Sequence, residues 1–273
     1  MDWEITTRLF FFFGIFAIMA YWERKRPRRP LHHSTTGRWI NNLGLVVINS
    51  VTLKLVFPIA AVGLALHAEQ QGWGLLNIYS LPAPLAILLA VIALDFCIYL
   101  QHVLFHSVPL LWRLHMVHHA DLDYDLTTGL RFHPIEIILS MLIKFAAILV
   151  IGPSALAVIM FEIILNACAM FNHSNVKLPR IVDQSLRLIL VTPDMHRVHH
   201  STIKQETNSN YGFSLSIWDR LFGTYRPQPS LGHDNMQIGL EQFRDPNKLN
   251  LAWLLALPFI GKLGRYPINR DQN

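Results

Sequence analysis

The sequence predicts an all-α integral membrane protein, with a helical bundle of four or five membrane helices and a cytosolic helical cap that carries histidines. Apolar residues make up 52% of the 273-residue chain and charged residues only 15%, against about 25% charged in ordinary globular proteins. Most apolar residues fall into runs of helical length. Ten of the 14 histidines, in contrast, lie between residues 102 and 200, mostly where these runs end.

The first predicted membrane helix covers residues 9–22. No Lys or Arg precedes it over residues 1–7, whereas five basic residues follow it over residues 24–29. A signal peptide would carry its positive charge before the apolar run. The positive-inside rule therefore places the N-terminus outside and residues 24–29 in the cytosol.

The second predicted helix, residues 43–66, crosses outward with a kink at Pro58. Residues 67–82 are expected to form an outer loop, and residues 84–105 return inward. No Lys or Arg occurs between Lys54 and Arg113, as expected for two spans and the outer loop between them.

Residues 135–151 and 154–171 form two further apolar runs, separated by Gly152-Pro153, which predicts a helical hairpin. The apolar segment 251–260 is too short to cross a bilayer and is expected to lie along its surface. We divide the chain into N-terminal membrane helices with the outer loop (1–83), a catalytic domain with the histidines (84–230) and a cytosolic or interfacial tail (231–273).

Charge and cysteine content argue against a nucleic-acid-binding protein and against cysteine-based structural sites. The net charge is +5, but the one basic cluster flanks an apolar run, which is typical of membrane topology and not of nucleic-acid binding. Cys97 and Cys168 lie within apolar runs and form no C-x-x-C pair, so they predict neither a disulfide framework nor a cysteine zinc site.

The histidines form three groups at helical spacing. His102 and His106 form H-x-x-x-H, and two H-x-x-H-H boxes consist of His115, His118 and His119 and of His196, His199 and His200. Residues three and four apart share a helix face, so each group can direct two or three imidazoles toward one point. Because a polar nitrogen near lipid is costly unless it has a partner, we interpret these groups as metal ligands and not as core histidines.

The number of ligands predicts two metal ions. Eight histidines exceed the needs of one tetrahedral zinc, whereas two metals with about four nitrogens each fit the count. His173 follows an apolar helix and is a candidate ninth ligand. His133 is a weaker candidate ligand, and it could equally orient a ligand or contact the substrate. Imidazole suits Fe, Cu, Ni and Zn alike, but H-E-x-x-H and H-x-x-E-H are absent, which favours a redox pair.

Carboxylates near the boxes in sequence are expected to orient the imidazole N–H groups. They are Asp95, Asp121, Asp123, Asp125, Glu136 and Asp194. Glu162, a carboxylate within an apolar helix, is a candidate functional residue, with a structural hydrogen bond as the alternative.

The order of the three groups resembles that of the fatty acid hydroxylase and sterol desaturase superfamily. Residues 111–119 (LWRLHMVHH), 128–136 (TGLRFHPIE) and 192–200 (TPDMHRVHH) look like its conserved blocks, and Asn210-Tyr211-Gly212 and residues 218–225 follow as expected. The resemblance covers about residues 95–226. The spacing of the first box is the shorter of the two found in the family, which favours the sterol-oxidase and ether-lipid-oxygenase branches.

The resemblance implies a membrane-bound di-iron oxygenase that uses O₂ to hydroxylate or desaturate a lipid. It assigns iron ligation and catalysis to the eight box histidines, with His173 as a further ligand. Residues expected to support the ligands or the substrate are Asp95, Arg131, His133, Glu162, Asp194 and Asn210.

The sequence has no haem-attachment, Rossmann or ferredoxin-type cysteine motif, so electrons are expected from a separate cytochrome, ferredoxin or reductase. The expected location is a bacterial inner membrane, with the boxes facing the cytosol. A zinc-dependent membrane hydrolase and a metal transporter or sensor are the alternatives. A transporter should place its ligands at the bilayer midplane, whereas the boxes lie at the cytosolic ends of the helices.

Overall fold

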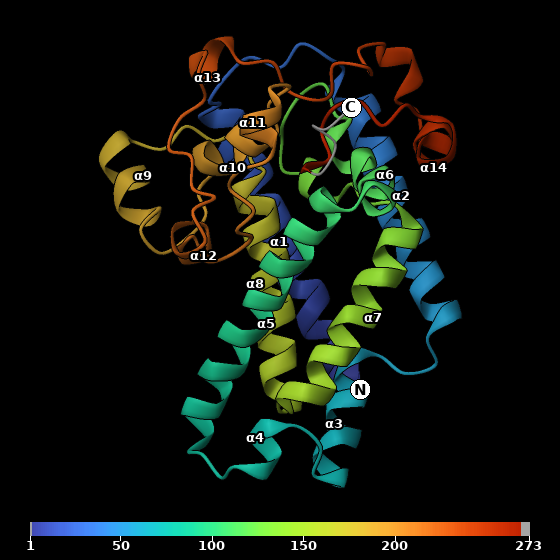
Figure 1. Cartoon of the computed structure of the whole chain (residues 1–273), viewed down its shortest axis with the longest axis vertical. Helices are drawn as coiled ribbons and strands as arrows, with labels where there is room; N and C mark the ends of the chain where they lie inside the picture. The colour runs from blue at the N-terminus through green and yellow to red at the C-terminus, as the bar shows by residue number, and fades with distance from the viewer. Residues whose placement is uncertain (1, 269–273) are drawn as a thin grey trace.

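A computed structural model describes residues 2–268 as a bundle of long helices with a cap of short helices at one end (Figure 1). The long helices are α1 (Asp2–Lys25), α2 (Thr35–Val56), α3 (Ala61–Gln71), α5 (Ala83–Ser107), α7 (Pro134–Ile151) and α8 (Ala155–Asn172). The cap contains α6 (Pro109–His119), η1 (Thr128–Leu130), α9 (Arg180–Leu186), α10 (Pro193–His199), α11 (Lys204–Thr207), α12 (Ile217–Leu221), α13 (Gly232–Asn235), η2 (Pro246–Lys248) and α14 (Leu251–Ile260). The short α4 (Leu75–Ile78) lies at the opposite end.

Five helical segments in the described part of the chain are long and apolar enough to cross a membrane. They are Trp3–Lys25, Thr35–Ile78, Ala83–Ser107, Pro134–Ile151 and Ala155–Asn172. This confirms the predicted membrane bundle, and the chain is an integral membrane protein. The first span is longer than expected, and Arg24 and Lys25 occupy its last turn, where cations interact favourably with the helix dipole.

The second predicted helix is broken and not merely kinked. Helix α2 ends at Val56 and α3 begins at Ala61, with Pro58 between them. Proline has no N–H to donate and its ring clashes with the preceding turn, so the helix stops here. The expected outer loop at residues 67–82 is also partly helical, because α3 continues to Gln71 and α4 follows.

Helices α7 and α8 form the predicted hairpin. Gly152 ends α7 with a φ of 70°, a left-handed conformation that favours glycine. The Ser154 side chain then caps α8 by accepting a hydrogen bond of 3.3 Å from the Ala157 N–H. The hairpin packs against α3 and α5.

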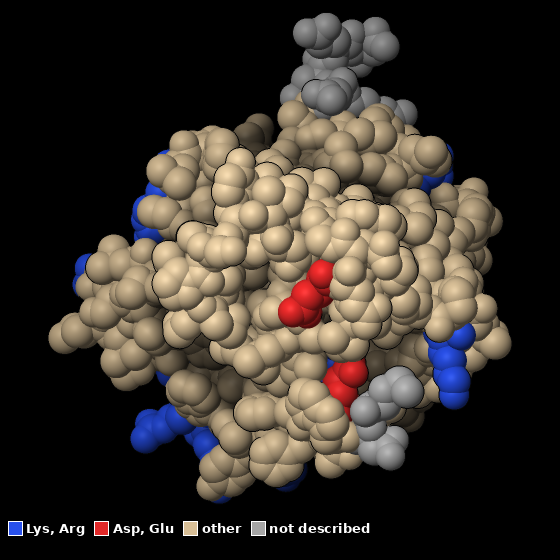
Figure 2. Space-filling model, turned by 90° about the horizontal axis from the view of Figure 1, so that it is seen from below, with Lys and Arg blue, Asp and Glu red and all other residues tan. Residues whose placement is uncertain are grey.

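The two ends of the molecule differ in charge. The cap end holds the end of α1 and the basic segment that follows it, with Arg24, Lys25 and Arg26 exposed. Figure 2 shows the opposite end, where acidic side chains lie near the middle of a mostly uncharged face and basic ones lie toward its outline. At the cap end, the C-terminal ends of α5 and α8 reach the base of the cap, where the histidines lie.

Candidate metal centre

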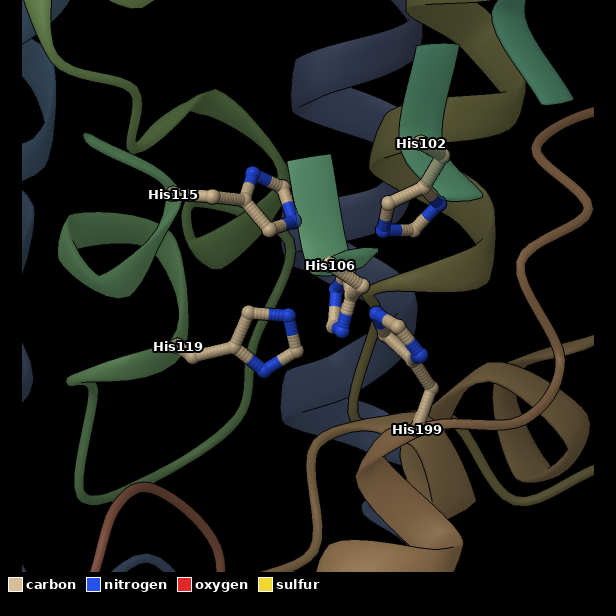
Figure 3. A group of neighbouring side chains, drawn as sticks. All are labelled: His102, His106, His115, His119 and His199. Atoms are coloured by element: carbon tan, nitrogen blue, oxygen red, sulfur yellow. The ribbon is translucent and has the colours of Figure 1, made fainter. Parts of the chain in front are cut away.

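Nine buried histidines form two clusters at the base of the cap. The first contains His102, His106, His115, His119 and His199, and the second contains His118, His173, His196 and His200. Within each cluster, one nitrogen of every ring lies within 4.8 Å of the others. Figure 3 shows the five rings of the first cluster, from α5, α6 and α10, arranged around a common centre.

Each H-x-x-H-H box divides its histidines between the two clusters. On α6, His115 and His119 join the five-histidine cluster and His118 joins the four-histidine cluster. The second box does the reverse, because His196 and His200 join the four-histidine cluster while His199 crosses to the other. At about 100° per residue, a side chain at i+4 lies about 40° to one side of residue i and one at i+3 about 60° to the other. The two box helices therefore stand between the clusters and serve both.

The two clusters touch each other. The rings of His119 and His200, one from each cluster, stack with their centroids 4.5 Å apart. The rings of His196 and His199 stack at 5.0 Å. Any two ions held by these clusters would therefore be neighbours.

Helix α8 supplies a histidine from outside the boxes. His173 follows the last residue of α8, and its Nε2 lies 3.1 Å from Nε2 of His196 and 3.2 Å from Nε2 of His118. Its Nδ1 donates to the Ala169 carbonyl at 2.8 Å. The structure thus brings the candidate ninth histidine together with the box histidines.

Hydrogen bonds from Nδ1 orient four of the other eight rings, whereas Nδ1 of His118, His119, His196 and His200 has no hydrogen-bond partner among the described residues. Three of these bonds have backbone or amide acceptors: the Tyr211 carbonyl for His102 (2.8 Å), Asn208 Oδ1 for His106 (3.1 Å) and the Ser209 carbonyl for His199 (2.7 Å). His115 donates to Glu136 Oε1 at 2.7 Å. A ring that donates from Nδ1 carries its lone pair on Nε2, so these four rings present a ligand nitrogen to the cluster centre.

The unpaired nitrogens fit bound metal ions. Nε2 of His102, His106, His115 and His199 is buried without a hydrogen-bond partner among the described residues. Buried polar atoms without partners are rare, because each costs about 1–3 kcal/mol. Burial also lowers the pKa of His115 and of His173 to about 3, which keeps these rings neutral, the form that binds a metal.

The six residues expected to support the site lie outside both clusters. Asp95 accepts hydrogen bonds from Trp218 Nε1 (2.8 Å) and the Leu215 N–H (3.2 Å). Glu162 pairs with Lys144 at 2.7 Å and with Arg8, and it precedes His173 by eleven residues, about 16 Å along α8.

The remaining four bind neighbouring elements of the cap. Arg131 donates to the Val117 carbonyl at 2.8 Å, and His133 caps α7 and lies 3.1 Å from the Leu255 carbonyl. Asp194 pairs with Arg28 at 3.2 Å and with Arg197. Asn210, at a φ of 52°, donates to the carbonyls of Met195 and Arg226 at 2.8 Å.

The aspartates that follow the His115–His119 box do not orient imidazoles as expected. Asp121 and Asp125 bind Arg38 of α2 at 2.8 and 2.5 Å, and Asp123 accepts from the backbone N–H groups of His32 and His33. Glu136 is the member of the expected carboxylate set that holds a ring. The backbone carbonyls of residues 169, 209 and 211, which accept hydrogen bonds from His173, His199 and His102, were not predicted. Every residue has a backbone carbonyl, so the sequence does not distinguish these three.

Two aromatic rings beside the clusters are only partly buried. Phe132 stacks on His118, with centroids 4.6 Å apart and ring planes 9° apart, and Phe213 lies 6.3 Å from His173. Other aromatic neighbours, such as Trp112, Tyr124 and Tyr211, are buried. Phe132 and Phe213 therefore offer apolar surface beside the histidines.

The fold and the histidine clusters define a multi-span membrane protein with a site that could hold two metal ions. A profile of the fatty acid hydroxylase family matches residues 87–224, which is 138 of the 273 residues. The chain therefore belongs to the fatty acid hydroxylase family, as the histidine boxes predict. No solved structure matches it.

Curated relatives of the chain include lipid-modifying enzymes. Ornithine lipid hydroxylase OlsE of Rhizobium tropici is 27% identical over 230 residues, covering 78% of this chain and 66% of the relative. Alkylglycerol monooxygenase of Xenopus tropicalis is 31% identical over 228 residues, covering 82% of this chain and 48% of the relative. The human alkylglycerol monooxygenase is 33% identical over 159 residues, covering 57% of this chain and 34% of the relative. The matches thus span one third to two thirds of the relatives' length.

Proposed function

We propose that this protein is a di-iron oxygenase that uses O₂ and external electrons to hydroxylate or desaturate an unactivated C–H bond of a membrane lipid. The observation that carries the proposal is the pair of adjoining, buried, all-imidazole clusters at the base of the cap. Imidazole nitrogen suits iron as well as other transition metals. The choice of iron rests on membership of the fatty acid hydroxylase family.

The nine histidines of the two clusters would hold the metals. Iron ions bound there would supply the activation of O₂ and the oxidation of the C–H bond, which side chains alone cannot perform. The hydrogen bonds donated by Nδ1 of His102, His106, His115, His173 and His199 would hold these five rings in their ligating orientation. Burial of all nine side chains would keep bulk water away from the reaction.

The lipid tail would approach beside Phe132 and Phe213. These rings are in contact with the four-histidine cluster and are partly exposed, so a hydrocarbon chain placed against them would lie beside the histidines. The two kinds of relative suggest substrates to test first, an ornithine lipid and an alkylglycerol. Both are proposals for this chain.

The remaining parts of the proposal concern orientation and partners. The exposed basic side chains of Arg24, Lys25 and Arg26 at the end of α1 support a cytosolic position of the cap in a bacterial inner membrane. Electrons would come from a separate cytochrome, ferredoxin or reductase, which would dock on the cytosolic side.

Metal content and turnover of purified protein test the proposal. Wild-type protein in lipid nanodiscs should contain two irons and form a product that has gained one oxygen or lost two hydrogens, in an O₂-dependent reaction. A fully active enzyme that holds two zinc ions and needs no O₂ would overturn the oxygenase assignment in favour of the hydrolase.

Single substitutions test the ligands. His199→Ala should remove one ligand of the five-histidine cluster, and His118→Ala one of the four-histidine cluster, and each should lower bound iron and abolish turnover. His32→Ala is the matched control, because its side chain is exposed and lies outside both clusters. Product formation that survives both cluster substitutions would show that the site is elsewhere.

A further inference from the structure

Exposed apolar side chains gather on one flank of the cap. They belong to α9, to the turn after it and to the end of α12: Ile181 (79% exposed), Val182 (42%), Leu188 (64%), Ile189 (66%), Leu221 (64%) and Phe222 (55%). We call these six residues the α9–α12 patch. Isolated apolar residues are ordinary on protein surfaces, but a group of this kind marks a surface that contacts a protein or a membrane.

The patch adjoins the membrane-spanning helix α5. Phe222 stacks on Phe96 and Tyr99 of α5, with centroids 5.7 and 5.5 Å apart. The Trp218 ring also lies 4.8 Å from Phe96. Because Phe96 is eleven residues before the end of α5 at Ser107, the Trp218 and Phe222 rings contact α5 about 16 Å along the helix from that end. In Figure 1, α12 accordingly lies at the lower edge of the cap, beside the upper part of the bundle.

The patch is continuous with the exposed face of α5, which argues that lipid covers it. Leu100 and Leu104 of the same span are 47% and 44% exposed. A soluble protein partner that covered Phe222 would have to enter the bilayer beside this span. Lipid already covers the outward face of α5, so lipid can cover the patch without any additional partner.

Charge next to the patch favours anionic headgroups. Lys177 and Arg180 are exposed where the chain enters α9. Asp183, the acidic residue of α9, is buried and pairs with Arg187, so both of their charges are neutralised internally. The exposed charge at this edge is therefore positive, which is the pattern of segments that bind the surface of anionic membranes.

We propose that the α9–α12 patch is immersed in the leaflet on the cap side, with its apolar side chains among acyl chains and Lys177 and Arg180 against anionic headgroups. This part of the cap is then a membrane-inserted element, whereas the sequence suggested a wholly cytosolic one. The proposal does not depend on the reaction that the protein catalyses.

Nitroxide labels on the full chain test the immersion. Ile189→Cys and Leu221→Cys would each be labelled in a Cys97→Ala, Cys168→Ala background and placed in nanodiscs of phosphatidylcholine and phosphatidylglycerol. Power-saturation spectroscopy then compares the access of O₂, which enriches in lipid, with that of a water-soluble nickel chelate. Leu88→Cys on α5 (56% exposed) is the lipid-facing reference, and Asp234→Cys, whose side chain is 75% exposed, is the aqueous reference.

We expect both patch labels to give the O₂-to-nickel ratio of the Leu88→Cys label. A ratio like that of Asp234→Cys would overturn the proposal, and so would low access for both reagents, which would indicate contact with a second copy or another protein. The headgroup part predicts that Lys177→Gln with Arg180→Gln, or discs without phosphatidylglycerol, lowers the ratio. An unchanged ratio in both cases would refute that part.

Discussion

The contact between Glu136 and His115 allows a quantitative test of the metal centre. Glu136 Oε1 accepts from His115 Nδ1 at 2.7 Å, and both side chains are buried, with 3% and 4% of their surface exposed. Removing a partner that orients a ligating histidine costs about 10- to 100-fold in metal affinity. At about 1.4 kcal/mol for each factor of ten, this is a loss of about 1.4–2.8 kcal/mol.

Two substitutions of Glu136 should give losses of metal affinity at the two ends of this range. Glu136→Gln keeps an acceptor oxygen but replaces the carboxyl group with an amide, so we expect about a tenfold loss of affinity. Glu136→Ala removes the acceptor and leaves the His115 ring free to rotate, so the loss should approach 100-fold. His115 belongs to the five-histidine cluster, and the four-histidine cluster should therefore keep its metal.

Chelator titration with elemental analysis of the retained metal measures these losses. One of the two metals should be released at a chelator concentration about ten- or 100-fold lower than in wild type. Glu206→Gln is the matched control, since Glu206 is also buried but accepts from the N–H and Oγ of Ser230. Equal loss of both metals from Glu136→Ala, or no loss at all, would refute the reasoning.

Two further substitutions distinguish metal binding by the four-histidine cluster from the stability of the helical bundle. Gly129→Ala would place a Cβ 2.6 Å from the Ala169 carbonyl and 2.9 Å from His173 Nδ1, so we expect the four-histidine cluster to lose metal while the five-histidine cluster keeps it; full occupancy of both would contradict this. Glu162→Gln removes the counter-charge of Lys144 and Arg8 within the bundle and should destabilise the protein by about 3–5 kcal/mol in unfolding in detergent, with metal content of the folded fraction unchanged. A free energy of unfolding equal to that of wild type would show that the ion pairs of Glu162 with Lys144 and Arg8 do not stabilise the bundle.

Hydropathy and charge were sufficient to predict the membrane spans but not the shape of the second one. The apolar run continues through residues 57–60, and hydropathy is high on both sides of Pro58, so composition alone does not show that α2 ends there. The division of the chain at residues 83 and 230 stays a prediction.

The spacing of the histidines predicted which rings would meet, whereas their anchors depend on long-range folding. Asp121 and Asp125 lie within six residues of His119, yet they bind Arg38 of α2. Glu136, twenty-one residues from His115, reaches the ring because α7 starts beside α6. A separation in sequence thus says little about which carboxylate orients a ligand.

The crossed arrangement of the two boxes has a consequence for how the two metal sites depend on each other. Helix α6 gives two ligands to the five-histidine cluster and one to the other, and α10 gives one and two. A shift of either helix would therefore disturb both sites, whereas loss of one side chain disturbs one. His118 and His199 are the crossing residues, so His118→Ala should weaken the cluster to which α10 contributes most. If it weakened the five-histidine cluster instead, each box would act as a unit and the division between clusters would be wrong.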